Sequence, residues 1–574
     1  MQGEKWLLGG LVLAAGLLPV PASADEIANY TPVTAQRLAN PEPGNWMLYR
    51  RTYDGQGYSP LDQINASNVK ELVPVWTFST GVTEGHEAPP IVNNGVMFVA
   101  TPQDQVIALN AKTGDQMWLY KRKLPEDLFQ LHPTSRGVAL WQDKVYLAST
   151  DDHLVALDAK TGKVAWDQKV EDYKRGQYMT LMPLAVDGKI LIGGSGGEFG
   201  VRGYVAAYDA DSGKELWRTY TIPGPGEPGH DTWQGDDWKT GGGTAWMTGT
   251  YDPGLNLVYW GVGNAAPWPG GLHPGDNLYT SSVLALDPET GKIKAHFQYH
   301  QNDSWDWDEV DAPMLIDLQR NGQTIKSLVH PGRDAIFWVL ERSPDKINFV
   351  AGWPFVYNNV WKALDPETGR LTVDPDHKPG LGKRIEFCPS LWGGKDWPSA
   401  SYSPKTHLVY VPAQNGFCGG FAGIKEPLVP GQLWLGTKPE DIGLTIQPGT
   451  DHHGELQAWD PATGKKVWQH NFPWQLFAST LATGGNLVFV GGTNDRMFRA
   501  FDAETGNMLW EQKTNSGITG APVAYEVDGT EYIAVQSGWG VDAQRIQDAL
   551  VNDKTGLSDN VPQGGVVWVF AVKK

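Results

Sequence analysis

One phrase recurs along this chain, first as Val106-Ile-Ala-Leu-Asn-Ala-Lys-Thr-Gly114-Asp-Gln-Met-Trp118. Each copy predicts a hairpin: an alternating strand, a tight turn in which glycine takes a positive φ, and a second strand that ends in tryptophan. A further strand precedes most copies, as in Lys144-Val-Tyr-Leu-Ala. The other copies cover residues 154–166, 205–217, 456–468 and 498–510, with Ala295 in the tryptophan position of the copy at 283–295 and a weaker copy at 363–369.

Four short antiparallel strands that recur about every 40 to 50 residues are the signature of a β-propeller blade. Composition agrees, because 68 glycines, 40 prolines and a charged fraction of only 19% suit short strands joined by tight turns. A length of 574 residues accommodates eight blades better than six or seven. The sequence therefore predicts an all-β, eight-bladed β-propeller in which residues 25–574 form a single domain.

The N-terminus has the pattern of a secretory signal peptide. Lys5 precedes an uncharged stretch from residue 6 to residue 20, and Ala22-Ser23-Ala24 follows it. We therefore expect cleavage after Ala24 and export to the periplasm. No later segment stays apolar for the ~20 residues that a bilayer span needs. In an oxidising compartment Cys388 and Cys418 most simply form one disulfide, the alternative being two free thiols.

The chain is acidic, with a formal net charge of −19 and no basic tract. This charge excludes phosphate backbones and anionic membranes as partners. A basic protein or a bound cation fits better. The chain also lacks Cys-x-x-Cys-His, the attachment pattern of c-type haem.

An unusual acidic stretch covers residues 302–311, Asn-Asp-Ser-Trp-Asp-Trp-Asp-Glu-Val-Asp, with five acidic groups among ten residues. Like charges this close repel one another, whereas a bound multivalent cation keeps them ionised. If Asp306-Trp307-Asp308 is extended, both carboxylates lie on one face and the tryptophan on the other. One carboxylate could then ligate a metal while the other acts as a base. The alternative is a solvated acidic loop.

A second unusual stretch is residues 193–200, Gly-Gly-Ser-Gly-Gly-Glu-Phe-Gly, at the expected end of a strand. Glycines let the backbone approach a flat ligand closely, and a lone carboxylate among small residues requires a cation. A simple turn would not need Glu198. Two further segments, 237–246 and 259–268, are too specific for a generic blade.

These segments resemble those of the pyrroloquinoline quinone (PQQ) alcohol dehydrogenases, and the recurring phrase resembles the tryptophan-docking motif of their propellers. The repeats alone also resemble the non-catalytic propeller lipoprotein of outer-membrane assembly, so they leave an enzyme and a protein-binding scaffold both open. The other segments favour the enzyme, because a scaffold has no use for Glu198, Asn264 and Asp306 at the family's spacings. The resemblance covers nearly the whole chain after residue 24.

The resemblance implies a role for each matching residue. In the family, the quinone is contacted at the positions of Ser195, Gly196 and Gly197. Thr244 matches a hydrogen-bonding threonine, and Trp246 matches the floor on which the ring stacks. A large rigid indole suits a flat tricyclic ring, although a core tryptophan is the alternative. Further cofactor contacts are implied for Glu87, Arg136, Thr180, Arg333, Lys395, Asp396 and Trp539, with Asp396 at a position where asparagine is common.

The resemblance also implies the catalytic group and the metal. Asp306 matches the catalytic base, and Asp308 matches the additional carboxylate that marks the lanthanide-using members. A trivalent ion needs more negative charge than a divalent one, and hard oxygen ligands suit both. We therefore expect a lanthanide(III), with Ca²⁺ as the alternative, bound by Glu198, Asn264, Asp306 and Asp308.

One position departs from the family. Its adjacent cysteine pair, which forms a disulfide ring over the cofactor, falls where this chain has Gln130-Leu131. The ceiling above the cofactor must then come from other side chains, such as Leu131 or His132. This departure indicates a subfamily with a roomier, differently shaped pocket than that of the methanol and ethanol dehydrogenases.

The resemblance thus predicts a periplasmic, PQQ-dependent dehydrogenase that oxidises an alcohol to an aldehyde or ketone. Asp306 would accept the alcohol proton while the metal acts as a Lewis acid and the quinone accepts hydride. Because the chain has no haem, its electrons must pass to a separate carrier, a soluble c-type cytochrome. Nucleic acid is not expected as a partner. The identity of the alcohol and the choice between monomer and homodimer stay open.

Overall fold

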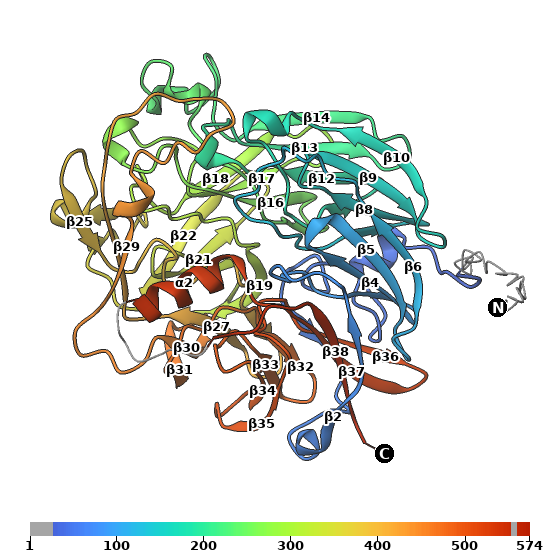
Figure 1. The fold of residues 1–574 in the computed structure, drawn as a ribbon. Coiled ribbons are helices and arrows are strands. Elements are labelled where there is room, and N and C mark those ends of the chain that lie inside the picture. The colour runs from blue at the N-terminus through green and yellow to red at the C-terminus, as the bar shows by residue number, and fades with distance from the viewer. Residues whose placement is uncertain (1–26, 553–559, 574) are drawn as a thin grey trace, which may run out of the picture.

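Eight mainly antiparallel sheets surround a common axis in the computed structural model, which describes residues 27–552 and 560–573 (Figure 1). Within this described part, seven of the sheets have four strands and one has five. The predicted all-β propeller is confirmed, and the number of sheets equals the predicted number of blades.

The first five sheets each take four consecutive strands. The first three are β3 (Ile91–Asn93), β4 (Val96–Thr101), β5 (Gln105–Asn110) and β6 (Gln116–Lys121); β7 (Ala139–Trp141), β8 (Lys144–Ala148), β9 (His153–Asp158) and β10 (Val164–Lys169); and β11 (Leu184–Val186), β12 (Lys189–Gly193), β13 (Tyr204–Asp209) and β14 (Glu215–Tyr220). The next two are β15 (Thr250–Asp252), β16 (Leu257–Val262), β17 (Ser282–Leu286) and β18 (Ile293–Gln298); and β19 (Met314–Arg320), β20 (Gln323–Pro331), β21 (Ile336–Arg342) and β22 (Ile347–Pro354).

The last three sheets are not built from four consecutive strands: one is interrupted by an insertion, and two include a strand from near the N-terminus. They are β26 (Ser401–Ser403), β27 (Leu408–Gln414), β30 (Gly454–Asp460) and β31 (Lys465–Phe472); β1 (Tyr58–Ser59) with β32 (Leu481–Thr483), β33 (Leu487–Val490), β34 (Met497–Asp502) and β35 (Met508–Lys513); and β2 (Leu72–Ser79) with β36 (Val523–Val527), β37 (Thr530–Ser537) and β38 (Val566–Val572). In the last sheet β2 pairs antiparallel with β38, from Leu72 opposite Val572 to Ser79 opposite Val566. Figure 1 shows these blue and red strands side by side, and their pairing closes the ring.

The recurring tryptophans join neighbouring sheets. The indole Nε1 of Trp118 donates a hydrogen bond to the carbonyl of Ala159 in the next sheet at 2.9 Å. A Cβ on the turn glycine Gly162 would lie 2.6 Å from the Trp118 ring, so only glycine lets the indole pack against this turn. Trp166 makes the same bond to the carbonyl of Ala210 at 3.1 Å. The tryptophan docking predicted from the repeats is therefore confirmed.

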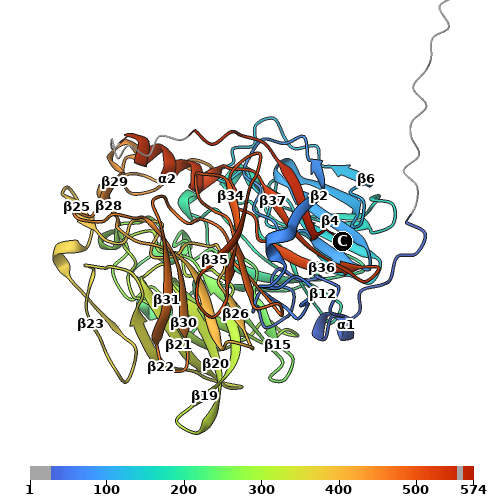
Figure 2. The same cartoon turned by 90° about the horizontal axis from the view of Figure 1, so that it is seen from below.

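Three regions depart from this regular pattern. The weaker copy at 363–369 belongs to a separate hairpin, β23 (Trp361–Leu364) and β24 (Leu371–Val373), outside the eight sheets. A second insertion forms a small sheet of β25 (Arg384–Phe387), β28 (Phe417–Ala422) and β29 (Gly443–Ile446). The third is the helix α2 (Val541–Asn552), which contacts β29; Figure 2 shows it together with β25, β28 and β29 on one face of the propeller. The remaining α-helix of the described residues is α1 (Ala35–Ala39).

Cys388 and Cys418 form a disulfide that ties the end of β25 to β28, as predicted. The predicted signal peptide, residues 1–24, lies outside the described residues. Among the helices that the structure describes, none combines the length and the apolar character needed to cross a bilayer.

Candidate functional site

A cavity of about 450 Å³ brings together most of the residues that the sequence predicts for the cofactor and the metal. Its wall reaches from the ends of the blades to α2 and β29. Ten predicted residues line it: Arg136, Thr180, Ser195, Gly196, Glu198, Trp246, Asp306, Asp308, Arg333 and Asp396.

The loop that carries Asp306 and Asp308 is buried, so the alternative of a solvated acidic loop is wrong. The two aspartates are only 8% and 7% exposed, and both line the cavity. Trp307 packs on the other side, where its indole stacks on that of Trp305 with ring centroids 4.9 Å apart. Asp306 has a φ of 67°, so the local backbone is not the extended strand that we considered. The turn at Asp306 nevertheless leaves both carboxylates on the cavity side.

Asn264 connects the two aspartates. Its amide Nδ2 donates to Oδ1 of Asp306 at 3.1 Å, and its backbone N–H donates to Oδ1 of Asp308 at 2.8 Å. Glu198, in the single helical turn Gly197–Phe199 within the glycine-rich stretch, lines the same cavity. The four predicted metal ligands are thus gathered at one place in the fold.

The carboxyl groups of Asp306 and Asp308 resist ionisation on their own. Burial raises the pKa of Asp306 well above its usual range, and the neighbouring Asp308 raises it further. Burial also raises the pKa of Asp308, to about 7, although Arg333 opposes the shift. Buried carboxyls with raised pKa values are typical of sites where a cation supplies the missing charge.

Arg333 links the aspartate loop to the opposite wall of the cavity. Its Nη1 donates to the backbone carbonyl of Asp306 at 2.8 Å. Its Nη2 forms an ion pair with Asp396 and lies 3.7 Å from Asp308. Its Nε is buried without a hydrogen-bond partner among the described residues. That donor is therefore free for a ligand in the cavity.

Trp246 presents one side to the cavity and is only half-buried, unlike a core tryptophan. Its Nε1 donates to Oδ2 of Asp308 at 3.0 Å, which fixes the indole beside the acidic cluster. The Arg136 guanidinium lies 4.7 Å from the indole centroid. Arg136 in turn pairs with Glu87 at 2.9 Å and donates to Thr180 Oγ1 at 2.5 Å.

The glycine-rich stretch forms a tightly packed part of the wall. A Cβ on Gly196, whose φ is 105°, would lie 2.2 Å from the carbonyl oxygen of Gly176, so no other residue fits. A Cβ on Gly197 would lie 3.4 Å from Oγ1 of Thr244, which places this pair together. Ser195 Oγ is buried and has no hydrogen-bond partner in the described part of the chain.

Some predicted residues lie behind the wall rather than in it. Lys395 Nζ is bound by Asp311 at 2.6 Å and by two backbone carbonyls, one of them that of Asp396. Trp539 Nε1 donates to Oε1 of Gln547 in α2 at 2.8 Å. Four more predicted residues lie outside the lining. Glu87 and Asn264 contact Arg136 and Asp306, which do line the cavity, and Gly197 and Thr244 lie against each other.

The PQQ family model, described as the β-propeller domain of glucose, ethanol and alcohol dehydrogenases, matches residues 46–345 and 471–533. The quinoprotein alcohol dehydrogenase PedH of Pseudomonas putida is 39% identical over 556 residues, covering 91% of this chain and 90% of PedH. The chain belongs to the PQQ-dependent alcohol dehydrogenase family. A quinoprotein ethanol dehydrogenase of Pseudomonas putida is 35% identical to this quinoprotein and covers 98% of it, with 95% of the relative covered. Among solved structures, a europium-containing methanol dehydrogenase superposes with a TM-score of 0.87 at 33% identity, covering 94% of this chain and 99% of that one.

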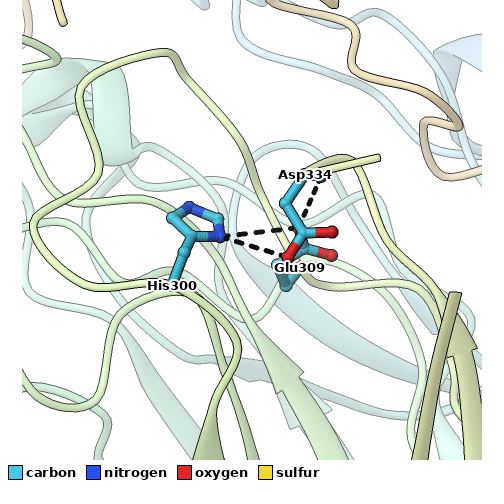
Figure 3. A group of neighbouring side chains, drawn as sticks. All are labelled: His300, Glu309 and Asp334. Carbon is cyan, nitrogen blue, oxygen red and sulfur yellow. Dashed lines mark hydrogen bonds and ion pairs between the residues drawn. The ribbon is translucent and has the colours of Figure 1, made fainter. Parts of the chain in front are cut away.

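Sequence reasoning missed a buried polar cluster beneath the aspartate loop of the quinoprotein. Figure 3 shows its centre, His300, Glu309 and Asp334, where Nδ1 of His300 lies 3.7 Å from both carboxylates. The other ring nitrogen, Nε2, lies 2.9 Å from Oδ1 of Asp303. The acidic stretch can be recognised in the sequence, but the contacts of its carboxylates with His300 can be seen only in the structure.

This cluster positions the two loops that carry site residues. The Asp303 carboxylate accepts backbone N–H bonds from Trp305, Asp306 and Trp307 at 3.1 to 3.3 Å. The Glu309 carboxylate accepts the backbone N–H of Arg333 at 3.2 Å. Although burial alone would lower the pKa of His300, hydrogen bonds with its acidic neighbours raise it to about 10. Because its carboxylates already accept backbone N–H bonds from both loops, the cluster acts as an internal ionic network beneath the predicted metal ligands.

Proposed function

We propose that this quinoprotein is a periplasmic dehydrogenase that uses PQQ and one metal ion to oxidise an alcohol to an aldehyde or ketone. The observation that carries the proposal is the cavity wall, in which Glu198, Asp306 and Asp308 lie with the half-buried Trp246. A scaffold that binds protein partners has no use for buried carboxyls aimed into a cavity, because burying them is costly without a ligand.

The cavity wall offers PQQ both a flat aromatic surface and polar groups that can form hydrogen bonds. Trp246 offers an indole face for a planar ring, and aromatic surfaces of this size pack well against flat π systems. Ser195 Oγ and Arg333 Nε supply hydrogen-bonding atoms that find no partner within the described chain. Arg136 adds positive charge for a polyanionic cofactor.

The acidic cluster fits a hard cation. Glu198, Asp306 and Asp308 supply carboxylates and Asn264 an amide oxygen, the ligand types that calcium and lanthanide ions prefer. The three negative charges of these carboxylates neutralise a trivalent ion, whereas they exceed the charge of a divalent one. The europium in the methanol dehydrogenase with a similar structure supports the same choice, so we propose a lanthanide(III), with Ca²⁺ as the alternative.

Metal binding should release protons. We expect that adding La³⁺ to the cofactor-free protein in weak buffer releases more protons at pH 6 than at pH 8. Asp308, with a pKa of about 7, is largely protonated at pH 6 and must lose its proton to ligate the ion. A pH-indicator titration measures the release, with Asp308→Ala as the matched variant that should release less. Equal release by both proteins, or a release that does not change with pH, would contradict the assignment.

When bound, PQQ would serve as the hydride acceptor, and the metal, held by Glu198, Asn264, Asp306 and Asp308, would serve as a Lewis acid. Asp306 then accepts the proton of the alcohol hydroxyl through its carboxylate, which the amide of Asn264 orients at 3.1 Å. Arg333 holds the backbone of this aspartate by a 2.8 Å hydrogen bond to its carbonyl.

The remaining wall suits an alcohol with an apolar substituent. Aliphatic side chains from β29, from the segment before it and from the loop after β25 line this part of the cavity. A site of this kind binds apolar groups by burial and leaves the hydroxyl for the polar end. The aliphatic residues are Leu391, Leu433, Leu435, Ile442 and Leu444.

The proposed setting follows from the sequence and the chemistry. The pattern of residues 1–24 and the Cys388–Cys418 disulfide support export to an oxidising compartment. Residues 25–574 then form the single domain of the exported protein. Each turnover leaves two electrons on the cofactor, so a soluble c-type cytochrome is the proposed acceptor for a chain without a haem attachment pattern. Whether the protein acts as a monomer or a homodimer does not affect this chemistry.

Replacing Trp246 by alanine tests the cofactor assignment. We expect Trp246→Ala to retain PQQ about 10-fold less tightly, because the stacking surface and the anchor of Asp308 are both lost. Gel filtration of the reconstituted protein followed by absorbance measures retention. The thermal unfolding temperature of the cofactor-free variant should change little, since the indole is only half-buried. A large drop in the unfolding temperature of the cofactor-free variant would show that Trp246 is structural. Unchanged PQQ retention would refute its role as the floor of the cofactor site.

A further inference from the structure

Helix α2 and the loop before Arg136 meet at the rim of the cavity through one arginine. Arg545 Nη2 donates to the carbonyl of Leu131 at 2.7 Å. Its Nη1 lies 3.0 Å from Nε2 of His132 and donates to Oδ1 of Asp542 at 2.9 Å. Leu131, His132, Asp542 and Arg545 all line the cavity. The contact therefore belongs to the boundary of the cofactor pocket and not to a remote surface.

Both sides of this contact are anchored. In α2, Ile546 and Leu550 are fully buried, and the carbonyl of Ala543 accepts a hydrogen bond from Gln475 at 3.3 Å. On the loop side, Leu131 packs against the buried cluster that contains Tyr178. An arginine held between two anchored elements fixes their separation, because its planar group donates in several directions at once.

We propose that Arg545, Asp542 and His132 form a noncovalent clasp that holds Leu131 and His132 over the cofactor as the ceiling of its pocket. The inference rests on the proposed function for the identity of the cofactor. The clasp lies where the family has its adjacent cysteines, at Gln130-Leu131, and it explains how this chain closes the pocket without them. Arg545 is a positioning residue: it acts through the loop and touches no reacting atom.

The clasp predicts two effects of Arg545→Ala that a merely structural role would not produce together. In the cofactor-free protein, amide hydrogen exchange at residues 129–134 should become faster, because the loop loses its tie to α2. In the reconstituted protein, PQQ should dissociate roughly tenfold faster, the scale of losing a hydrogen bond to a charged group. The unfolding temperature should stay nearly unchanged, since the Arg545 side chain is 42% exposed.

Two further variants sharpen the experiment. Arg545→Lys keeps the charge but cannot reach Leu131 and His132 together, so it should give an intermediate dissociation rate. Asp548→Asn changes an exposed residue one turn further along the same helix and should leave both readouts at the wild-type values.

The possible outcomes distinguish a failure of the clasp from a failure of the proposed function. Unchanged loop exchange and unchanged PQQ dissociation in Arg545→Ala would overturn the clasp, as would equal effects in Asp548→Asn. If the wild type binds no PQQ while Arg545→Ala still loosens the loop, the proposed function fails and the tie between loop and helix stands.

Discussion

Asp306→Asn is expected to lower alcohol turnover by roughly 100-fold or more while leaving the fold intact, the usual effect of losing a general base. Asparagine has the shape of aspartate and can still contact Asn264, but it cannot take the alcohol proton. The backbone of residue 306 stays held by Arg333 and by the Asp303 carboxylate, so the loop should keep its place. Dye-coupled turnover at saturating PQQ and metal measures the loss.

A surface exchange of the same kind provides the control. Asp276→Asn removes a carboxylate that pairs with Arg370 at 2.9 Å on the exposed surface, and turnover should be unaffected. Circular dichroism and thermal unfolding establish that both variants are folded. Near-normal turnover in a folded, PQQ-loaded Asp306→Asn protein would remove Asp306 from the catalytic role.

Asp308→Ala should show the second large effect, a loss of lanthanide selectivity. Asp308 lines the cavity and bonds both the Trp246 indole and the Asn264 backbone, so it does not point away into the neighbouring acidic run. Removing one buried unit charge a few ångströms from a trivalent ion costs several kcal/mol, so La³⁺ should bind at least 100-fold more weakly. Ca²⁺ should lose less, because its charge is smaller.

Titrating metal-free wild type and Asp308→Ala with Ca²⁺, La³⁺ and Ce³⁺ decides this point. PQQ-dependent activity should respond to the lanthanides in the wild type and shift toward calcium in the variant. Equal activation of both proteins by calcium, without any lanthanide response, would show that the second aspartate does not select the metal.

The propeller could be predicted because the same local sequence pattern recurs in most of its blades. The alternating strand, the turn glycine and the docking tryptophan lie within 13 residues, as in 106–118, so local pattern alone determines each hairpin. The structure bears this out in the bonds of Trp118 and Trp166 to the next sheet. The weaker copy at 363–369 was the exception, because it forms a hairpin outside the eight sheets, with Gly369 against Phe349 of β22.

The site was predictable where a motif is contiguous and less so where distant segments meet. Asp306 and Asp308 line one cavity with Glu198, as their motifs predicted. In contrast, Lys395 is engaged behind the wall by Asp311, which no spacing along the chain could indicate.

The clasp and the buried histidine network lay beyond sequence reasoning for the same reason. Arg545 and His132 are 413 residues apart, and only the closed ring brings them together. His300 is close to Asp303 in sequence, but its burial depends on packing, and so does the pKa that its acidic hydrogen-bond partners raise against that burial. Residues that act through contacts between segments therefore need the structure.

The most direct measurement of the central claim is alcohol-dependent dye reduction by the purified protein, given PQQ, metal, both or neither. Primary, secondary and bulky apolar alcohols should be compared, with La³⁺ and Ca²⁺ as the metals. Turnover is expected only when PQQ and a metal are both present and should be fastest with the lanthanide, and the protein should show the absorbance of bound PQQ. Tight PQQ binding in the presence of metal, with no oxidation of any of these alcohols, would contradict it.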